Sequence, residues 1–242
     1  MELRGRVALV TGAGRRLGQA IAVALGAAGA RVAVHHHGSV EGAADTVRRI
    51  EAAGGEARTF RADLREPDAP ARLVNDVAAA FSRLDVLVNS AAVMERTPLG
   101  EVTPAQWDAM MALNLRAPFF AAQAAAAHMR DGGVIVNVAD LAAFETWPAY
   151  VPHGISKAGV VRMTRSLARA LAPAVRVVGV APGAVLLPDD WDDGTAGRLA
   201  ETTPLRRLGT PDDVVGAVLY LVGADYVTGE TLLVDGGRHV RT

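Results

Sequence analysis

The sequence predicts a single α/β domain over residues 1–242, built on a doubly wound parallel sheet of seven strands with helices on both faces. Three observations support this prediction. Short apolar runs alternate with helix-like segments along the whole chain, which is the pattern of an α/β layer fold. The runs are continuous, as in strands that are covered on both faces. The links are short, so each strand–helix–strand unit should form a right-handed crossover.

Each element is expected where its residue pattern starts and stops. The first half of the chain predicts strands at residues 7–10, 31–35, 57–61 and 86–88, with helices at 17–28, 41–53 and 68–82 between them. The second half predicts a helix from about 104 to 129, a strand at 134–138, a helix to 170, a strand at 175–180, a helix from 211 and a strand at 231–234. The irregular stretch beginning at 184 is long enough to form a substrate lid, which we place at about 184–203.

The composition excludes several classes of function. Half of the residues are hydrophobic and the net charge is −1, which gives no electrostatic footprint for nucleic acid or an anionic membrane. There is no cysteine, which excludes disulfides and thiol catalysis. The chain starts without a signal peptide pattern, so a cytoplasmic protein is expected. Of the 25 basic side chains only Lys157 is a lysine, which suggests a site that needs a compact ammonium group.

A glycine-rich segment follows the first predicted strand and opens the first predicted helix. Gly12, Gly14 and Gly18 allow backbone amides to approach a pyrophosphate at the helix N-terminus. The intervening residues of this loop are Arg15, Arg16 and Leu17. Its position directly after the first strand of many strand–helix units predicts a dinucleotide site.

The end of the second strand indicates which dinucleotide is bound. Folds that bind NAD place an acid there for the ribose hydroxyls, but this chain has no acid before Glu41. Cations and donors for a 2′-phosphate are available instead from Arg15, Arg16, His36, His37 and Ser39. We therefore expect NADPH rather than NADH. The histidine triplet also leaves a metal site open, since His35 and His37 share a face of an extended strand, but we expect no metal.

Over essentially its whole length the chain resembles the short-chain dehydrogenase/reductase family. The resemblance is carried by the motifs Thr11-Gly12 to Leu17-Gly18, Asp63-Leu64, Asn89-Ser90-Ala91, Asn114, Ser156-Lys157-Ala158-Gly159, Pro182-Gly183 and the closing YVTGETLLVDGG. It implies that Asp63, Leu64, Asn89, Ser90, Ala91, Lys157, Pro182 and Gly183 contact the cofactor. It also implies a proton-relay water held at Asn114 and, by analogy only, a homotetramer.

Within that family the motifs resemble pteridine reductases most closely. Arg16 stands where most members have a glycine, and the segment HHHGS is similar to the one those enzymes use for the NADPH phosphate. Asp140 stands where most members have the catalytic serine, and it lies 13 residues before His153. The stretch PDDW at residues 188–191 is similar to their substrate loop.

The resemblance implies a catalytic tyrosine at the position of His153. Pro152 suits the first turn of a helix, so His153 and Lys157 should share one helix face at i and i+4. Tyr150 then precedes the helix and is a poor substitute. A histidine can donate a proton near neutral pH without help from a lysine. We therefore expect His153, paired with Asp140, to be the general acid, while Lys157 holds the nicotinamide ribose.

These observations favour an NADPH-dependent oxidoreductase that transfers hydride to a small carbonyl or imine, such as a pterin. One alternative is a 3-oxoacyl or ketone reductase. Another is a catalytically impaired protein that still binds NADPH, because the tyrosine position is altered. The expected partner is a small-molecule substrate, with neither nucleic acid nor membrane involved.

Overall fold

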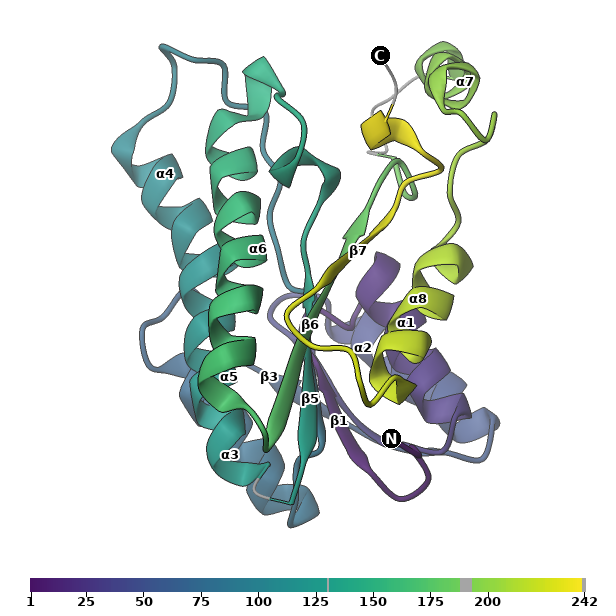
Figure 1. The fold of residues 1–242 in the computed structure, drawn as a ribbon. Helices are drawn as coiled ribbons and strands as arrows, with labels where there is room; N and C mark the ends of the chain where they lie inside the picture. Colours follow the sequence, from purple (N-terminus) through teal and green to yellow (C-terminus); the bar gives the residue numbers. More distant parts are fainter. Residues whose placement is uncertain (130, 188–192, 241–242) are drawn as a thin grey trace.

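The computed structural model describes residues 1–129, 131–187 and 193–240, and it forms three layers (Figure 1). A seven-stranded sheet with the order β3-β2-β1-β4-β5-β6-β7 lies in the middle, and every neighbouring pair of strands is parallel. Helices α1, α2 and α8 cover one face, and α3, α4, α5 and α6 cover the other. The doubly wound parallel sheet that the sequence predicts is confirmed.

The first half of the chain contributes the edge formed by β3 and β2 and the centre of the sheet. Its elements are β1 (Val7–Val10), α1 (Arg16–Ala27), β2 (Arg31–His36), α2 (Val40–Ala52), β3 (Glu56–Arg61), α3 (Ala69–Phe81) and β4 (Val86–Asn89). The bounds differ from the sequence prediction by at most one residue. β2 extends to His36, which brings a second histidine of the triplet into the sheet.

The second half completes the sheet. Its elements are α4 (Pro104–Met111), a π-helical turn η1 (Ala112–Arg116), α5 (Ala117–His128), β5 (Gly133–Val138), α6 (Val151–Leu171), β6 (Val175–Pro182), α7 (Asp193–Thr202), α8 (Pro211–Gly223) and β7 (Thr231–Val234). Short 3-10 turns stand at Leu141–Ala143, Pro148–Tyr150 and Arg238–Val240.

One prediction for this half needs correction. The single helix expected over 104–129 is interrupted by the π-helical turn. In such a turn the backbone hydrogen bonds join residues five apart instead of four. Within the lid expected around 184–203, the structure describes the helix α7. Residues 188–191, the PDDW stretch, lie outside the described residues.

The continuous apolar runs are explained by two hydrophobic cores, one on each face of the sheet. Val10 and Val88 point toward α1 and α8, whereas Leu9 and Leu87 point toward α3 and α5. Successive strand residues face opposite sides of a sheet, so both sets must be apolar when both faces are covered. All four of these residues are fully buried. The sheet is therefore a rigid platform for whatever stands at its ends.

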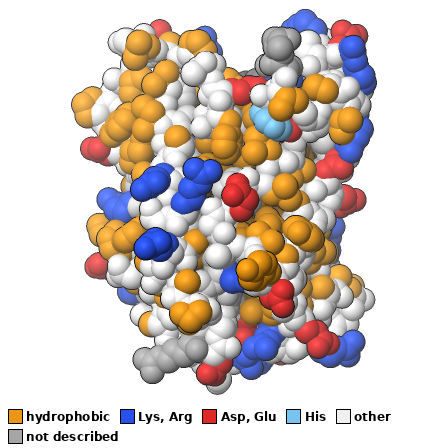
Figure 2. Space-filling model, in the orientation of Figure 1, with side chains coloured by type: hydrophobic (Ala, Val, Ile, Leu, Met, Phe, Trp, Pro, Cys, Tyr) orange, Lys and Arg blue, Asp and Glu red, His pale blue; other side chains and the backbone are white. Residues whose placement is uncertain are grey.

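The carboxyl ends of the strands meet at one edge of the sheet. The glycine loop follows β1, His37 follows β2, Ser90 follows β4 and Asp140 follows β5 by one residue, so segments far apart in the sequence converge there. Figure 2 shows the molecule hollowed at this end, between the part that carries α4 and α6 and the part that carries α7. Among the described helices, none has the length and apolar character needed to cross a membrane.

Candidate active site

The glycine loop is tightly closed against the strands beside it. Gly12 has a φ of +68°, and a Cβ there would lie 2.9 Å from the Cα of Ala91. A Cβ at Gly18 would lie 2.4 Å from the carbonyl oxygen of Gly12. No side chain fits at either position, so only glycine allows the loop to pass so close to α1 and to β4. The structure thus gives Gly12 and Gly18 a packing reason that is independent of any ligand.

His35 holds this loop from below. Its Nδ1 accepts the backbone amide of Gly12 at 3.1 Å, and its Nε2 donates to the carbonyl oxygen of Ala62 at 3.1 Å. This pattern requires a neutral ring with its hydrogen on Nε2. Burial lowers the pKa of His35 to about 4, which keeps the ring neutral. Sequence reasoning placed His35 only in the metal alternative and missed this role.

The residues that follow β4 are organised by Thr11. Its hydroxyl oxygen accepts the backbone amides of Ser90 at 2.9 Å and Ala91 at 3.0 Å. Asn89 donates instead to the side chain of Asn137 at 2.9 Å, inside the core. The structure therefore brings Asn89, Ser90 and Ala91 to the edge beside the glycine loop, with the Asn89 side chain used to join β4 to β5.

Two histidines, an aspartate and an arginine lie where β2 and β3 end. His36 is buried, and its Nδ1 has no hydrogen-bond partner among the described residues. Burial lowers the pKa of His36. His37 is exposed, with Nε2 at 3.7 Å from Asp63. The guanidinium of Arg65 hydrogen-bonds Asp63 at 2.7 Å and lowers its pKa to about 2, so the charge of this acid is balanced by a cation.

The remaining predicted residues near this region are placed as follows. Leu64 is buried, and Ser39 precedes α2 and packs against Gly14, where a Cβ would lie 3.0 Å from the Ser39 Cβ. His35 and His37 do not share a site, because His35 points into the loop and His37 lies beyond the end of β2. Among the described residues no group of three histidine, aspartate or glutamate side chains is placed to hold a metal ion.

The two arginines of the loop behave differently. Arg15 is exposed and precedes the first residue of α1. Arg16 has a φ of +52°, which is a left-handed conformation that costs a non-glycine residue free energy. Its guanidinium donates to the carbonyl oxygens of Leu186 at 2.6 Å and Leu187 at 3.2 Å. Arg16 therefore joins the glycine loop to the segment after β6, a contact that the sequence does not predict.

The segment after β6 begins at the same edge. Pro182 is the last residue of β6, and Gly183 donates its amide to the carbonyl of Val234 at 3.0 Å. A Cβ at Gly183 would lie 2.8 Å from the Cα of Asp235, so this turn also excludes a side chain. The two predicted residues thus lie against the end of β7.

Helix α6 presents the altered catalytic motif. A 3-10 turn ends at Tyr150 and α6 begins at Val151, so Tyr150 precedes the helix as predicted. Tyr150 packs edge-on against Trp147, with the ring centroids 6.2 Å apart. His153 and Lys157 are both buried on the face of α6 that points at β5. The expected shared face of these two residues is confirmed.

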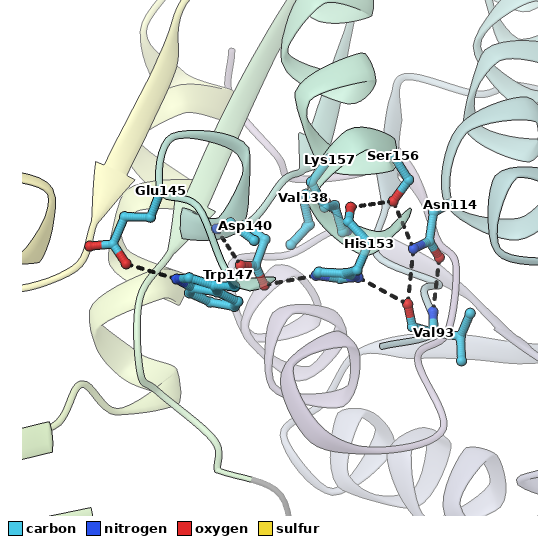
Figure 3. A network of polar contacts seen from close by, with 10 residues as sticks. Val93, Asn114, Val138, Asp140, Glu145, Trp147, His153, Ser156 and Lys157 are labelled. Carbon is cyan, nitrogen blue, oxygen red and sulfur yellow. Dashed lines mark hydrogen bonds and ion pairs between the residues drawn. The ribbon is translucent and has the colours of Figure 1, made fainter. Parts of the chain in front are cut away.

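Figure 3 shows His153 between two oxygen groups that come from different elements. Its Nδ1 lies 3.2 Å from the carbonyl oxygen of Val93, and its Nε2 lies 3.6 Å from Oδ2 of Asp140. Oδ1 of Asp140 accepts the backbone amide of Ala142 at 2.8 Å. The structure therefore brings together the two residues that the sequence singled out at a spacing of 13.

Lys157 is buried close to this pair. Its Nζ donates to the carbonyl oxygen of Val138 at 2.9 Å. Burial lowers the pKa of Lys157, and the negative charge of Asp140 partly opposes that effect. A buried ammonium group with one backbone partner has donors left over for another hydroxyl. That capacity suits the ribose-holding role which the family resemblance implies.

Asn114 connects the π-helical turn to the segment after β4. Its side chain accepts the amide of Val93 and donates to the Val93 carbonyl, each at 2.9 Å. It also donates to the hydroxyl of Ser156 at 3.1 Å. The carbonyl oxygen of Val93 is therefore a shared hydrogen-bond acceptor for the side chains of Asn114 and His153. The sequence indicated Asn114 but not Val93. Val93 contributes its backbone carbonyl oxygen, which every residue type has, so its identity as a valine gives no indication of this role.

These features fit an NADP-type dinucleotide. The N-terminus of α1 lies at the strand edge, and the His36 Nδ1 is a buried polar atom that lacks a partner among the described residues. The position after β2 carries His37 instead of an acid. A phosphate group suits that combination of donors better than a ribose hydroxyl does.

Comparison with known proteins agrees with this geometry. The model of the enoyl-(acyl carrier protein) reductase family matches residues 12–239. The chain is 41% identical over 243 residues to a protein assigned as ketoacyl reductase 2 of the granaticin polyketide synthase from Streptomyces violaceoruber, covering 97% of this chain and 96% of that one. It therefore belongs to the short-chain dehydrogenase/reductase family, whose members are NAD(P)-dependent oxidoreductases.

Two solved structures are similar over nearly their whole length. The angucycline C-6 ketoreductase LanV, solved with bound NADP, has a TM-score of 0.94 and 34% identity, covering 99% of this chain and 98% of that one. FolM alternative dihydrofolate reductase 1 from Brucella canis, complexed with NADP, also has a TM-score of 0.94, at 29% identity, covering 100% and 96%. The fold is thus shared by ketone-reducing and pterin-related enzymes.

Proposed function

We propose that this chain is an NADPH-dependent ketoreductase whose substrate is a small molecule with a ring ketone or a 3-oxoacyl group. The higher identity to a ketoacyl reductase and to LanV supports a ketone, in preference to the pterin that the motifs suggest. The observation that carries the proposal is the pair His153 and Asp140, two ionisable groups held together beside the buried Lys157 at the strand edge.

The cofactor residues are assigned by their place at this edge. The glycine loop with Arg15 receives the pyrophosphate, His36, His37 and Ser39 receive the 2′-phosphate, and Lys157 holds the nicotinamide ribose. The remainder of the cofactor site is lined by Asp63, Leu64, Asn89, Ser90, Ala91, Pro182 and Gly183. NADPH, when bound, supplies the hydride. The contact of Arg16 with the Leu186 carbonyl supports a second role for Arg16, in holding the segment that leads into the lid.

The chain itself must supply a proton to the carbonyl oxygen as negative charge develops there. A positioned acid contributes about 10²–10⁴-fold to such a step. We propose that His153 takes the position of the family's tyrosine and Asp140 that of its serine, so that this pair is the proton source. Asn114 supports the pair, because it fixes the Val93 carbonyl against which His153 rests.

The test is NADPH consumption by the purified protein with a panel of substrates. Fused-ring aromatic ketones and 3-oxoacyl thioesters should be reduced, with NADPH strongly preferred over NADH. Dihydropterins belong in the panel as the competing substrate class, and reduction of these alone would replace the ketone proposal. Tight binding of NADPH, measured by fluorescence, without turnover on any of the substrates would instead identify a cofactor-binding protein with an impaired site.

A further inference from the structure

The two ring nitrogens of His153 face groups that fix the position of their hydrogens. Nδ1 lies 3.2 Å from the Val93 carbonyl oxygen, which can only accept, so Nδ1 carries a hydrogen. Nε2 then carries a hydrogen only when the ring is a cation. Oδ2 of Asp140 faces that nitrogen at 3.6 Å. Whether these two atoms can form a hydrogen bond therefore depends on which of the two groups carries a proton.

A proton between these two groups relieves an otherwise unfavourable contact. A neutral His153 opposite an ionised Asp140 brings two lone pairs face to face. Nε2 is buried and has no hydrogen-bond partner among the described residues, and leaving such an atom unpaired is unfavourable. A charge-assisted hydrogen bond is shorter, at about 2.7–2.9 Å, than the 3.6 Å between the two atoms in the structure, so sharing the proton should draw them closer together.

Exposure decides which member of the pair can reach a substrate. The His153 side chain is 2% exposed, whereas the Asp140 side chain is 26% exposed. In Figure 3 the imidazole lies between Asp140 and Val93, with a contact at each nitrogen. Oδ1 of Asp140 is engaged by the Ala142 amide. Oδ2 of Asp140 is thus the one acidic position of the pair that is near both the imidazole and the surface.

We infer that His153 and Asp140 hold one proton between them, and that Asp140 delivers it to the substrate oxygen while His153 is a positioning residue behind it. This rests on the proposed ketone reduction. As the carbonyl carbon gains the hydride, the π bond breaks toward oxygen, the O–H bond of Asp140 breaks and the O–H bond of the alcohol forms. Asp140 is left as a carboxylate and His153 as a neutral ring, and one proton from water restores the pair.

Two charged groups from other positions lie near the pair. Lys157 lies below it on α6 and interacts electrostatically with Asp140. Glu145, on the loop between β5 and α6, accepts from the Trp147 indole at 2.9 Å. Removing the imidazole takes away the group that shares the proton with Asp140.

The test compares Asp140→Asn with His153→Gln. Asp140→Asn keeps the size of the side chain but removes its acidic proton, so kcat for ketone reduction should fall about 100-fold or more at every pH. His153→Gln can still donate to the Val93 carbonyl. The kcat of this variant should fall only about 10-fold, because Asp140 can still receive a proton from solvent. Glu145→Gln is the matched control, and its pH profile should follow the wild type.

NMR of isotope-labelled histidine nitrogens gives a readout without turnover. Nδ1 of His153 should carry a hydrogen in both the wild type and Asp140→Asn, while Nε2 should lose its shared proton in the variant. NADPH binding verifies that each variant is folded. Activity retained in Asp140→Asn but lost at all pH values in His153→Gln would overturn the inference and make His153 the donor. Absence of wild-type turnover would overturn the proposed function and the donor role together, and the NMR spectra would still decide whether the proton is shared.

Discussion

The backbone amide of Gly12 donates to Nδ1 of His35 over 3.1 Å, so a buried neutral histidine fixes the first glycine of the cofactor loop. The other ring nitrogen is tied to Ala62, at the end of β3. Three neighbouring strands are thereby joined through one imidazole directly beneath the loop. Protonation of Nδ1 would replace an acceptor by a donor that faces the Gly12 amide.

We predict that His35 makes stability depend on pH. Burial lowers the pKa of His35 from 6.5 to about 4. Between these pH values the imidazole is therefore protonated in the unfolded chain but neutral in the folded chain. The contribution of a neutral His35 is complete above pH 6.5 and is lost progressively as the pH falls toward 4, by about 3 kcal/mol in total.

The measurement is urea unfolding of the wild type and of His35→Asn at a series of pH values. Asparagine places an acceptor oxygen near the Nδ1 position and does not titrate. The free-energy difference between the two proteins should shrink as the pH is lowered through this range. Parallel pH dependences for both proteins would show that His35 is not the group responsible.

His37→Asp should reduce the preference for NADPH. His37 stands where NAD-binding folds carry an acid, and an aspartate there would repel the 2′-phosphate and accept from ribose hydroxyls. We expect the ratio of kcat/KM for NADPH over NADH to fall by about 10-fold or more, which corresponds to about 1.4 kcal/mol. Glu41→Gln, on the first turn of α2, serves as the control for a charge change nearby. An unchanged ratio in His37→Asp would place the 2′-phosphate elsewhere.

Lys157→Arg should impair the enzyme although charge is conserved. The Lys157 ammonium is buried and donates to the Val138 carbonyl at 2.9 Å. A planar guanidinium is larger and cannot occupy that position without moving β5 or α6. We expect a rise in the Kd for NADPH and at least about a 100-fold loss of kcat. Arg162→Lys, at an exposed position of the same helix, should change neither quantity, and wild-type kinetics in Lys157→Arg would refute the ribose-holding role.

Asp85 is predicted to stabilise the end of the sheet opposite the site. It is buried and accepts from Arg6 at 2.9 Å, Arg83 at 2.6 Å and the Val7 amide at 2.9 Å. Although burial opposes ionisation, these donors lower the pKa of Asp85. Its contribution is therefore present above the pKa of the unfolded chain and is lost only in stronger acid. Asp85→Ala should cost about 3 kcal/mol at neutral pH.

The control for Asp85 is Asp68→Ala, where the carboxylate is 86% exposed and 3.9 Å from Arg72. Such a surface pair contributes at most about 1 kcal/mol. Thermal unfolding of both variants under one condition gives the comparison. Equal losses in the two proteins would mean that the buried network adds nothing beyond an ordinary surface pair.

The homotetramer expected from the family resemblance also has a structural test. A hollow of about 560 Å³ lies between α4, α5 and α6, lined by Asp108, Met111, Ala112, Leu115, Arg116, Phe119, Phe120 and Met163. Phe119 and Phe120 are 39% and 38% exposed, and Figure 2 shows hydrophobic side chains gathered over α4 and α6. Covering such a surface with a second copy removes apolar area from water.

We therefore expect Phe120→Glu to shift the protein to a smaller assembly in sedimentation experiments. Leu99→Glu, which is 81% exposed and outside the hollow, is the control and should leave the assembly unchanged. A wild-type protein that sediments as a monomer would contradict the expected tetramer.

The sequence by itself determined the architecture and the location of the site. Continuous apolar runs define strands covered on both faces, and Gly12 and Gly18 are required wherever the loop passes so close to its neighbours. Strand ends in a doubly wound sheet share one edge, so His37, Ser90 and Asp140 had to converge there. These features follow from periodicity and backbone sterics, which act locally along the chain.

Only the tertiary structure decided what the polar groups do. His153 contacts the backbone of Val93, 60 residues away, and His35 contacts Gly12, 23 residues away. Arg16, expected at the cofactor, also donates to the carbonyl of Leu186. A backbone oxygen or amide offers the same chemistry whatever its residue type, so the sequence holds no record of which one a side chain will meet. The tautomer of each histidine, and with it the proton chemistry of the site, is set by those contacts.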